Sequence, residues 1–330
     1  MTPSSLLFLM TTITGTIIAL SSTNWLYLWM GMELNLLSFV PLIASSQHLQ
    51  ETEASVKYFI IQAIGSGVML TAGVLSMTMN STDNKTELLI NFTFLLSMTI
   101  KLGLAPCHQW LPHVMASMPW NMCLILSTWQ KISPFMMLTI IAPRNTALLI
   151  MSIAMLSAMV GGMGGMNQSQ LRTLLAYSSI GHMGWMLVAL NYSSNMFIMY
   201  FSIYVAITTS LMYMLTQTNM LKSNFNTAVN AMSTFPFMML MLMMFSLGGL
   251  PPFLGFLPKW MIINSLTTGE LFIVLTTLIT GSLMNLFYYF NMTFNFILSM
   301  KNLNKTSSSI SISNIALTSM CTLAPLIMFL

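Results

Sequence analysis

Two stretches of this sequence decide the fold: KLGLAPCHQWLPHVM at residues 101–115 and LGGLPPFLGFLPKWM at residues 247–261. When the two stretches are aligned residue by residue, the same residue types recur at six positions. The matched pairs are Gly103/Gly249, Leu104/Leu250, Pro106/Pro252, Leu111/Leu257, Pro112/Pro258 and Met115/Met261. Proline lacks a backbone donor and interrupts a helix. The sequence therefore predicts two broken helices. The breaks are expected at Pro106, Pro112, Gly249, Pro251, Pro252 and Pro258.

The chain around these stretches is that of a membrane protein. It has 330 residues, of which 56% are hydrophobic and only 5% are charged. Soluble domains carry about 25% charged residues, so lipid must cover most of this surface. The apolar stretches are continuous rather than alternating, which favours helices over a β-barrel.

Spans of about 20 apolar residues fill nearly the whole length. The predicted spans are 3–21, 24–45, 57–79, 88–118 (interrupted), 121–141, 146–165, 171–190, 195–217, 231–267 (interrupted), 270–298 and 310–329. The first span has no basic leader or cleavage site, so we expect it to be retained.

The two broken spans are the fourth and the ninth, so they run in opposite directions. Paired Gly/Pro-broken helices in inverted halves are typical of a transporter core. We predict an all-α, polytopic fold of about eleven transmembrane helices in two inverted five-helix repeats. The chain would form a single domain, 1–330, with repeats at 3–141 and 146–298 and a C-terminal helix at 310–329. The alternative is a chance match between two Pro-rich loops.

Composition also bears on location and partners. The 37 methionines are consistent with flexible apolar filler, or with a mitochondrial code that reads one isoleucine codon as methionine. The net charge of +4 includes no basic run for nucleic acid. The loop lysines and arginines, by the positive-inside rule, predict an N-terminus on the inner side. The three scattered cysteines argue against a disulfide framework or an iron–sulfur cluster.

Four charged residues lie inside apolar spans rather than at their ends: Glu33, Lys101, Lys131 and Lys259. A charge at the bilayer centre costs about 2.5–3.5 kcal/mol on insertion scales, so such residues normally pair or conduct ions. Burial disfavours the charged form of both lysine and glutamate, which lets each give up and regain a proton. We expect a line of proton-exchanging groups in which Lys131 bridges the two halves. The alternative is a static buried ion pair that fixes helix packing.

Histidines add further candidates. His182 lies within the seventh predicted span, and an imidazole titrates near neutral pH, which suits a proton relay. A neutral histidine bonded to a neighbour is the alternative. His108 and His113 flank the first break beside Cys107, a pattern too sparse for a metal site. Hydroxyl groups that could order water, or simply join helices, belong to Thr128, Tyr177, Ser178 and Ser179. The glycines of GGMGGMNQSQ (161–170) lack the ending of a phosphate loop and predict close helix packing.

Four segments of the chain together resemble a known family. The segments that carry the resemblance are WLYLWMGMELNLLSFVPLI (25–43), STWQKISPF (127–135), GGMGGMNQSQLRTLLAYSSIGHMGW (161–185) and SLGGLPPFLGFLPKW (246–260). In combination they resemble the NADH–ubiquinone oxidoreductase chain 2 family, the mitochondrially encoded, antiporter-like membrane subunits of respiratory complex I. The chain resembles the short form found in bilaterian animals.

The resemblance implies roles for particular residues. Glu33 corresponds to the family's intramembrane glutamate, Lys101 and Lys259 to the lysines on its two broken helices, and Lys131 to the lysine on the helix after the first. His182 falls in the family's YSSIxHMGW stretch on the central axis. One departure is His113, which stands where relatives commonly carry an acidic residue, in PCHQWLPHV (106–114).

The resemblance also implies a function: proton translocation coupled to electron transfer from NADH to ubiquinone, in the mitochondrial inner membrane. It implies no metal and no cofactor in this chain, because NADH, FMN, iron–sulfur clusters and ubiquinone bind other subunits. Expected partners are the membrane-arm and accessory subunits of complex I and membrane lipids such as cardiolipin. The alternatives are an Mrp-type cation/proton antiporter subunit and a purely structural membrane subunit.

Overall fold

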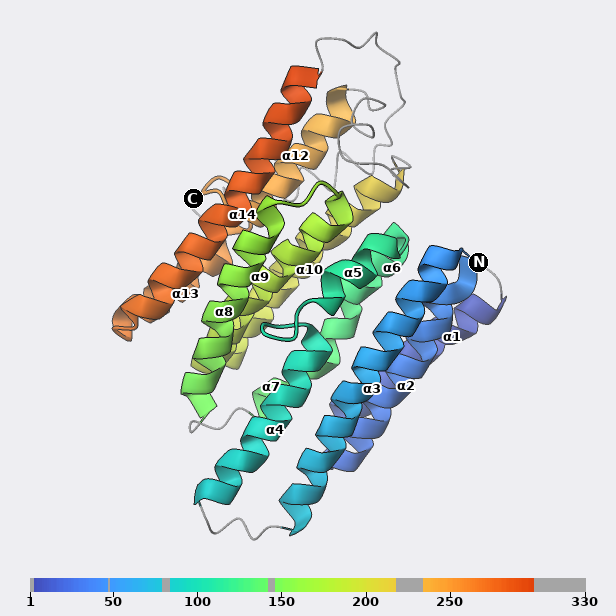
Figure 1. The fold of residues 1–330 in the computed structure, drawn as a ribbon. Helices are drawn as coiled ribbons and strands as arrows, with labels where there is room; N and C mark the ends of the chain where they lie inside the picture. The colour runs from blue at the N-terminus through green and yellow to red at the C-terminus, as the bar shows by residue number, and fades with distance from the viewer. Residues whose placement is uncertain (1–2, 47, 79–83, 142–145, 218–233, 300–330) are drawn as a thin grey trace. The chain divides into compact units, whose positions relative to one another are not determined.

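The structure is a computed structural model that describes residues 3–46, 48–78, 84–141, 146–217 and 234–299. Every regular element in these ranges is helical. The chain divides into two compact units, Met1–Ile153 and Ala154–Leu330, with the division inside one helix (Figure 1). The predicted helix at 310–329 lies outside the described residues, so the count of about eleven spans stays a prediction.

Each unit repeats one order of elements among its described residues: three continuous helices, a broken helix and a further helical segment (Figure 1). In unit 1 these are α1 (Pro3–Ser21), α2 (Trp25–Ile43), η1 (Ala44–Ser46), α3 (Leu49–Thr78), α4 (Asn84–Leu102), α5 (Trp110–Ser117), α6 (Trp120–Ser127), η2 (Trp129–Lys131) and α7 (Ile132–Ile141). Helix α8 (Ala147–Met166) crosses into unit 2, followed by α9 (Leu171–Tyr192), α10 (Ser194–Gln217), α12 (Thr234–Gly248), α13 (Phe256–Thr268) and α14 (Phe272–Ser299).

The apolar spans read from the sequence are present as helices. Among the described residues, seven helices are long and apolar enough to cross a membrane: α1, α2, α3, α8, α9, α10 and α14. All of these except α3 agree with the predicted boundaries within two residues, which is the usual uncertainty of a helix end. The all-α, polytopic fold class with two broken helices is therefore confirmed.

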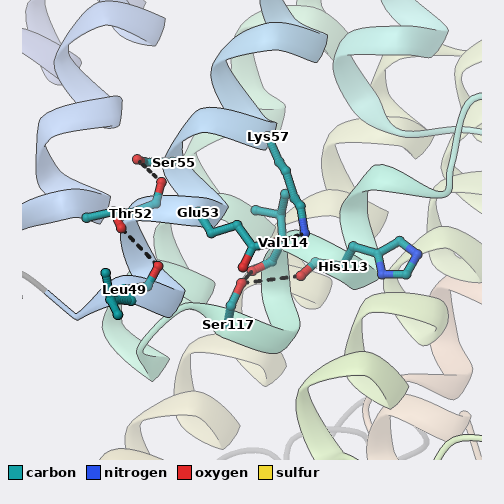
Figure 2. A network of polar contacts seen from close by, with 8 residues as sticks. All are labelled: Leu49, Thr52, Glu53, Ser55, Lys57, His113, Val114 and Ser117. Carbon is teal, nitrogen blue, oxygen red and sulfur yellow. Dashed lines mark hydrogen bonds and ion pairs between the residues drawn. The ribbon is translucent and has the colours of Figure 1, made fainter.

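Helix α3 begins earlier than predicted, at Leu49 instead of residue 57. The segment before Lys57 is polar in composition, but it has a helical face. Ala54 and Tyr58 are buried, whereas Glu53 and Lys57 point outward and form an ion pair 2.6 Å long, one turn apart (Figure 2). An amphipathic pattern thus extends the helix beyond its purely apolar part.

The span predicted as continuous over 121–141 is in fact interrupted. Helix α6 ends before Thr128, whose hydroxyl donates to Leu124 O at 2.7 Å, and a 3-10 turn leads to Lys131. Proline explains the interruption, because Pro134 has no N–H to donate to the carbonyl of Gln130. The prediction of an unbroken helix here was wrong, since it gave too little weight to this proline.

Both predicted breaks begin at a glycine with positive φ: 74° at Gly103 and 79° at Gly249. The hydrogen bonds around the two glycines match. Leu104 N donates to Thr99 O at 3.0 Å, and Leu250 N donates to Phe245 O at 3.4 Å. This pairing is the Schellman motif, in which a left-handed glycine ends a helix.

The chain becomes helical again at corresponding points after the two breaks. Pro112 is the third residue of α5, and Pro258 is the third residue of α13. Proline is tolerated in a first turn because the N–H it lacks would have no intrahelical partner there. The repeat read from the sequence therefore has the same local structure in both copies, which argues against a chance match.

Glycines allow the helices of each unit to pack backbone to backbone. A Cβ at Gly31 in α2 would lie 2.5 Å from Ala19 N in α1. A Cβ at Gly161 in α8 would lie 2.5 Å from Gly181 N in α9. Small residues at such crossings are typical of membrane helices. Close packing, the interpretation given to the GGMGGM glycines, is confirmed.

Candidate functional site

Lys101 lies at the end of α4, next to the first break, and is buried. Its Nζ donates to Met32 Sδ of α2 at 3.9 Å. Its methylene stem passes over Gly65 of α3, where a Cβ would lie only 3.0 Å from Lys101 Cγ. The fold therefore holds an ammonium group among α2, α3 and α4, where the described residues offer it a weak sulfur acceptor alone.

The break leaves carbonyl groups at the end of α4 that side chains must satisfy. Gln62 Nε2 of α3 donates to Lys101 O at 3.0 Å, and the indole N–H of Trp110 donates to Ile100 O at 3.1 Å. Both donor side chains are buried. A broken helix inside a membrane needs such partners, because lipid supplies none.

Glu33 of α2 is the acidic group that interacts electrostatically with Lys101. The side chain is half-buried, and its Oε2 has no hydrogen-bond partner among the described residues. Within those ranges no nitrogen of a basic group lies within 4.0 Å of its carboxylate. The two groups are charge neighbours rather than a contact pair, which argues against a static ion pair as their role.

Lys101 and Lys131 line one cavity of about 30 Å³ inside unit 1. Its polar lining comes from five helical segments. The polar residues are Asn35, Tyr58, Gln62, Lys101, Gln130, Lys131 and Ser133. A cavity needs roughly 10–15 Å³ and two to four polar partners to hold a water molecule. This one is therefore large and polar enough for about two water molecules.

A chain of neutral hydrogen bonds borders the same cavity. Gln130 Nε2 donates to Asn35 Oδ1 at 2.8 Å, and Tyr58 Oη donates to Gln130 Oε1 at 3.4 Å. Tyr58 in turn packs against Phe39 and Trp110, with ring centroids 5.3 and 5.9 Å away. The residue next to Lys131 is thus fixed to α2 and α3, which holds the turn that carries the lysine.

In unit 2, Lys259 lies in the first turn of α13 and is buried. Its Nζ donates to Gly248 O, the last residue of α12, at 2.7 Å. The ammonium group also lies 5.9 Å from the ring centroid of Trp185 in α9. Lys259 therefore supplies the partner that the broken α12 requires, while an aromatic face favours its positive charge.

The two lysines lie on opposite sides of their breaks. In the repeat alignment, Lys259 matches His113, an exposed residue of α5, and Lys101 matches Leu247. Each copy thus keeps one lysine at its break, but on a different half of the broken helix. This offset was visible in the sequence alignment, and its consequence is that only the second lysine caps the preceding helix.

His182 lies one turn before Trp185 on α9 and is buried. Its Nδ1 is 2.9 Å from Tyr200 Oη, and its ring is 5.4 Å from that of Tyr204. Residues three apart share a helix face, so His182 and the Trp185 ring beside Lys259 lie on one side of α9. A histidine bonded to a tyrosine can accept or donate a proton at either ring nitrogen.

The remaining candidates have more local partners. His108 Nδ1 lies 3.1 Å from Pro106 O, and the Ser117 hydroxyl donates to His113 O at 3.3 Å (Figure 2). The hydroxyls of Ser178 and Ser179 donate to Leu175 O and Ala176 O, one turn earlier in α9. No group of three or more His, Cys, Asp or Glu side chains in the described ranges is placed to hold a metal ion.

Comparison with known proteins shows which family the chain belongs to. Residues 22–285 match the family model described as NADH:quinone oxidoreductase/Mrp antiporter, transmembrane. NADH-ubiquinone oxidoreductase chain 2 of Lumbricus terrestris is 44% identical over 88% of this chain and 85% of its own length. The protein of the same name from Locusta migratoria is 38% identical over 94% of this chain and 90% of its own. The chain belongs to the NADH–ubiquinone oxidoreductase chain 2 family.

Solved structures share the fold of this family over longer evolutionary distances. A chain of respiratory complex I from Thermus thermophilus is 23% identical, with a TM-score of 0.82 over 99% of this chain and 79% of that one. A chain of the Mrp complex from Dietzia is 14% identical, with a TM-score of 0.74 over 92% and 61%. At these identities the likeness concerns the fold alone.

Four residues of the site were not among the candidates predicted from the sequence. Asn35, Tyr58, Gln62 and Gln130 complete the lining of the cavity that Lys101 and Lys131 share. Each is a neutral polar residue inside an apolar span, so a search for buried amides and hydroxyls, as well as charges, would have found them.

Proposed function

We propose that this chain is a membrane-arm subunit of a proton-translocating NADH:ubiquinone oxidoreductase. Membership of the chain 2 family supports the assignment to this enzyme. The cavity shared by Lys101 and Lys131 is the observation that supports proton movement within the chain. Two amines that face the same polar cavity can exchange a proton through bound water, because each has a neutral and a charged form.

Glu33 would control the first of these amines. A nearby carboxylate stabilises the ammonium form of Lys101, and this stabilisation falls as the distance grows. A small movement of α2 relative to α4 would therefore release a proton from Lys101 to the cavity and on to Lys131. In unit 2, Lys259 and His182 would form the corresponding pair, with the Trp185 ring beside Lys259 and one turn from His182 on α9. The proposed proton path is Glu33, Lys101, Lys131, His182 and Lys259.

The remaining assignments follow from the family and are proposals. The chain would act as one antiporter-like domain over 1–330 in the mitochondrial inner membrane, with other membrane-arm and accessory subunits and lipids, including cardiolipin, as its partners. We propose that NADH, FMN, iron–sulfur clusters and ubiquinone bind elsewhere in the complex, and that this chain binds no nucleic acid. An Mrp-type antiporter subunit remains the rival transporter, because the fold is common to both.

The test is proton pumping, measured together with NADH:quinone electron transfer, in membranes that carry Lys131→Met. We expect pumping to be lost, alone or together with electron transfer, in a complex that assembles normally. Lys57→Met is the matched control, because Lys57 is half-exposed on α3 and its ion pair with Glu53 faces outward.

The two rival hypotheses, a structural subunit and an antiporter subunit, each predict a different result. Unchanged turnover and an unchanged proton-to-electron ratio in Lys131→Met would exclude the lysine relay and favour a structural subunit. Cation/proton exchange by the isolated chain, without NADH:quinone activity in its native membranes, would favour the antiporter subunit.

A further inference from the structure

Helix α14 carries a polar face that the proton path above does not use. Asn285, Tyr288 and Tyr289 are spaced i, i+3 and i+4, which places them on one side of the helix. They are 4%, 2% and 1% exposed. Asn285 Oδ1 and both tyrosine hydroxyls have no hydrogen-bond partner among the described residues. Buried polar atoms without partners are uncommon, and each needs an explanation such as bound water or a functional role.

This face is held in place by glycines of three other helices. A Cβ at Gly181 in α9 would lie 2.7 Å from Asn285 Nδ2, and a Cβ at Gly165 in α8 would lie 2.6 Å from the Tyr288 ring. A Cβ at Gly248 in α12 would lie 3.5 Å from Tyr289 Cδ2. Gly248 is the residue whose carbonyl oxygen binds Lys259 Nζ. The Tyr289 ring therefore packs against the broken end of α12 that holds this lysine.

The other side of the same face leads toward His182. The hydroxyls of Tyr289 and Tyr204 interact electrostatically, and the Tyr204 ring lies 5.4 Å from the His182 ring, tilted by 46°. Ser178 of α9 interacts electrostatically with both α14 tyrosines, whose hydroxyls also interact with each other, but none of these contacts meets the geometric criteria of a hydrogen bond. Tyr288 and Tyr289 also pack edge to face, 4.7 Å apart. The polar face thus extends from the Lys259 cap to the histidine.

We propose that Asn285, Tyr288 and Tyr289 form a water-binding relay site that connects Lys259 with His182. The proposal rests on the proposed function and adds residues of α14 to it. It explains why three buried polar atoms occur on one helix face beside a protonatable lysine, and why glycines at 165 and 181 leave room for them.

The proton transfer is balanced without an oxidant or a leaving group. The Lys259 ammonium gives a proton to a bound water, which passes one of its own protons to the Tyr289 oxygen as that hydroxyl releases its proton to the Tyr204 oxygen, and the Tyr204 hydroxyl in turn releases its own proton. An imidazole nitrogen of His182 accepts the last proton. The net change converts the Lys259 ammonium to the amine and the His182 imidazole to the imidazolium, while each hydroxyl regains its proton.

The experiment compares Tyr289→Phe, Tyr288→Phe and the double variant in the assembled complex. These changes remove only the hydroxyls and keep the rings that pack on α8 and α12. We expect proton flux coupled to electron transfer to fall about tenfold or more in the double variant, since a positioned proton-transfer group contributes roughly 10²- to 10⁴-fold. Tyr213→Phe is the control, because Tyr213 lies on α10 of the same unit and is 40% exposed.

A second measurement does not depend on the variants. A high-resolution structure of the unmodified complex should contain water within hydrogen-bond distance of Asn285 Oδ1 and the two hydroxyls. Unchanged coupled flux in the double variant, or a dry site whose atoms bond only to protein, would overturn the relay. Lys131→Met, measured in parallel, separates the two ideas: if it abolishes pumping while the tyrosine variants do not, only this inference fails.

Discussion

At the scale of single residues, the helix-capping hydrogen bond of Lys259 and its proposed role in proton transfer depend on the same atom. Its Nζ completes the hydrogen bonding of the broken α12 by donating to Gly248 O. A neutral amine still carries N–H groups, so the bond can persist when the proton leaves. The cap therefore keeps the side chain in place in both protonation states. Among the residues that the structure describes, Lys101 Nζ has no such bond to a backbone oxygen, and instead Gln62 and Trp110 support its helix end.

Gln62→Leu tests whether Gln62 caps the end of α4 at the first break. The change leaves the buried Lys101 carbonyl without its donor, and an unsatisfied buried polar group costs roughly 1–3 kcal/mol. We expect a lower thermal unfolding temperature of the complex, measured by the loss of NADH:quinone activity on heating. Gln217→Leu, at the exposed end of α10, should leave the temperature unchanged. Equal effects of both changes would contradict the capping role.

At the scale of helices, the two breaks share a glycine in the left-handed region followed by a proline in the next helix's first turn. The glycine ends one helix in a geometry that gives some of the last carbonyl groups a hydrogen-bond donor. The proline lies in the first turn of the next helix, where the N–H that it lacks would have no intrahelical partner. The break thus places a lysine at a helix end, where backbone oxygens are available, instead of in the middle of a fully bonded helix.

Gly249→Ala should be harmful where Gly248→Ala is tolerated. At Gly249 the backbone φ of 79° is unfavourable for alanine by about 1–2 kcal/mol, and the new Cβ would lie 2.8 Å from Lys259 Nζ. At Gly248 the nearest atom is 3.5 Å away, an ordinary contact. We expect Gly249→Ala to lower coupled proton pumping severalfold in assembled complex. Similar pumping in both variants would show that the lysine does not need this geometry.

Helix α8 depends on glycine for its packing in unit 2. Gly161→Ala would place a Cβ 2.5 Å from the backbone nitrogen of Gly181, so α8 and α9 must move apart, at a cost of roughly 1–3 kcal/mol. We expect less assembled complex on native gels. Gly67→Ala in α3 meets no atom within 4 Å and should be neutral or slightly stabilising. The interpretation fails if the two variants assemble equally well.

At the scale of the whole molecule, the uneven distribution of loop charges predicts an orientation, with the N-terminus on the inner side. In unit 1, α2 separates two connections that must then lie on opposite sides of the membrane. Thr23 precedes α2, and Gln50 lies just beyond the turn that follows it. Both side chains are exposed.

Single cysteines at these positions test the orientation. In a background without the native cysteines, Thr23→Cys should react with an impermeant thiol reagent only from the outer side, and Gln50→Cys only from the inner side. The matched reagent added to inverted vesicles is the control for access. The opposite pattern would reverse the orientation but would leave the fold unchanged.

Much of this protein was decided by the sequence itself. Continuous apolar spans can only be helices in lipid, because no water is available to satisfy the backbone. The repeated glycine and proline pattern specifies local backbone geometry, and local geometry depends little on distant residues. Charges inside spans are costly, so their presence alone marks the candidate site. These reasons apply to Lys101, Lys259 and both breaks before any tertiary contact is known.

Only the tertiary structure decided which groups meet. That Gln62 caps α4, that Lys101 and Lys131 face one cavity, and that α14 brings its tyrosines to Gly248 depend on which helix faces pack together. A helix that is apolar on most sides carries little signal for its rotation, because lipid and protein neighbours attract the same residue types. The close approach of backbones at glycines settles that rotation, and it becomes visible only once the helices are packed.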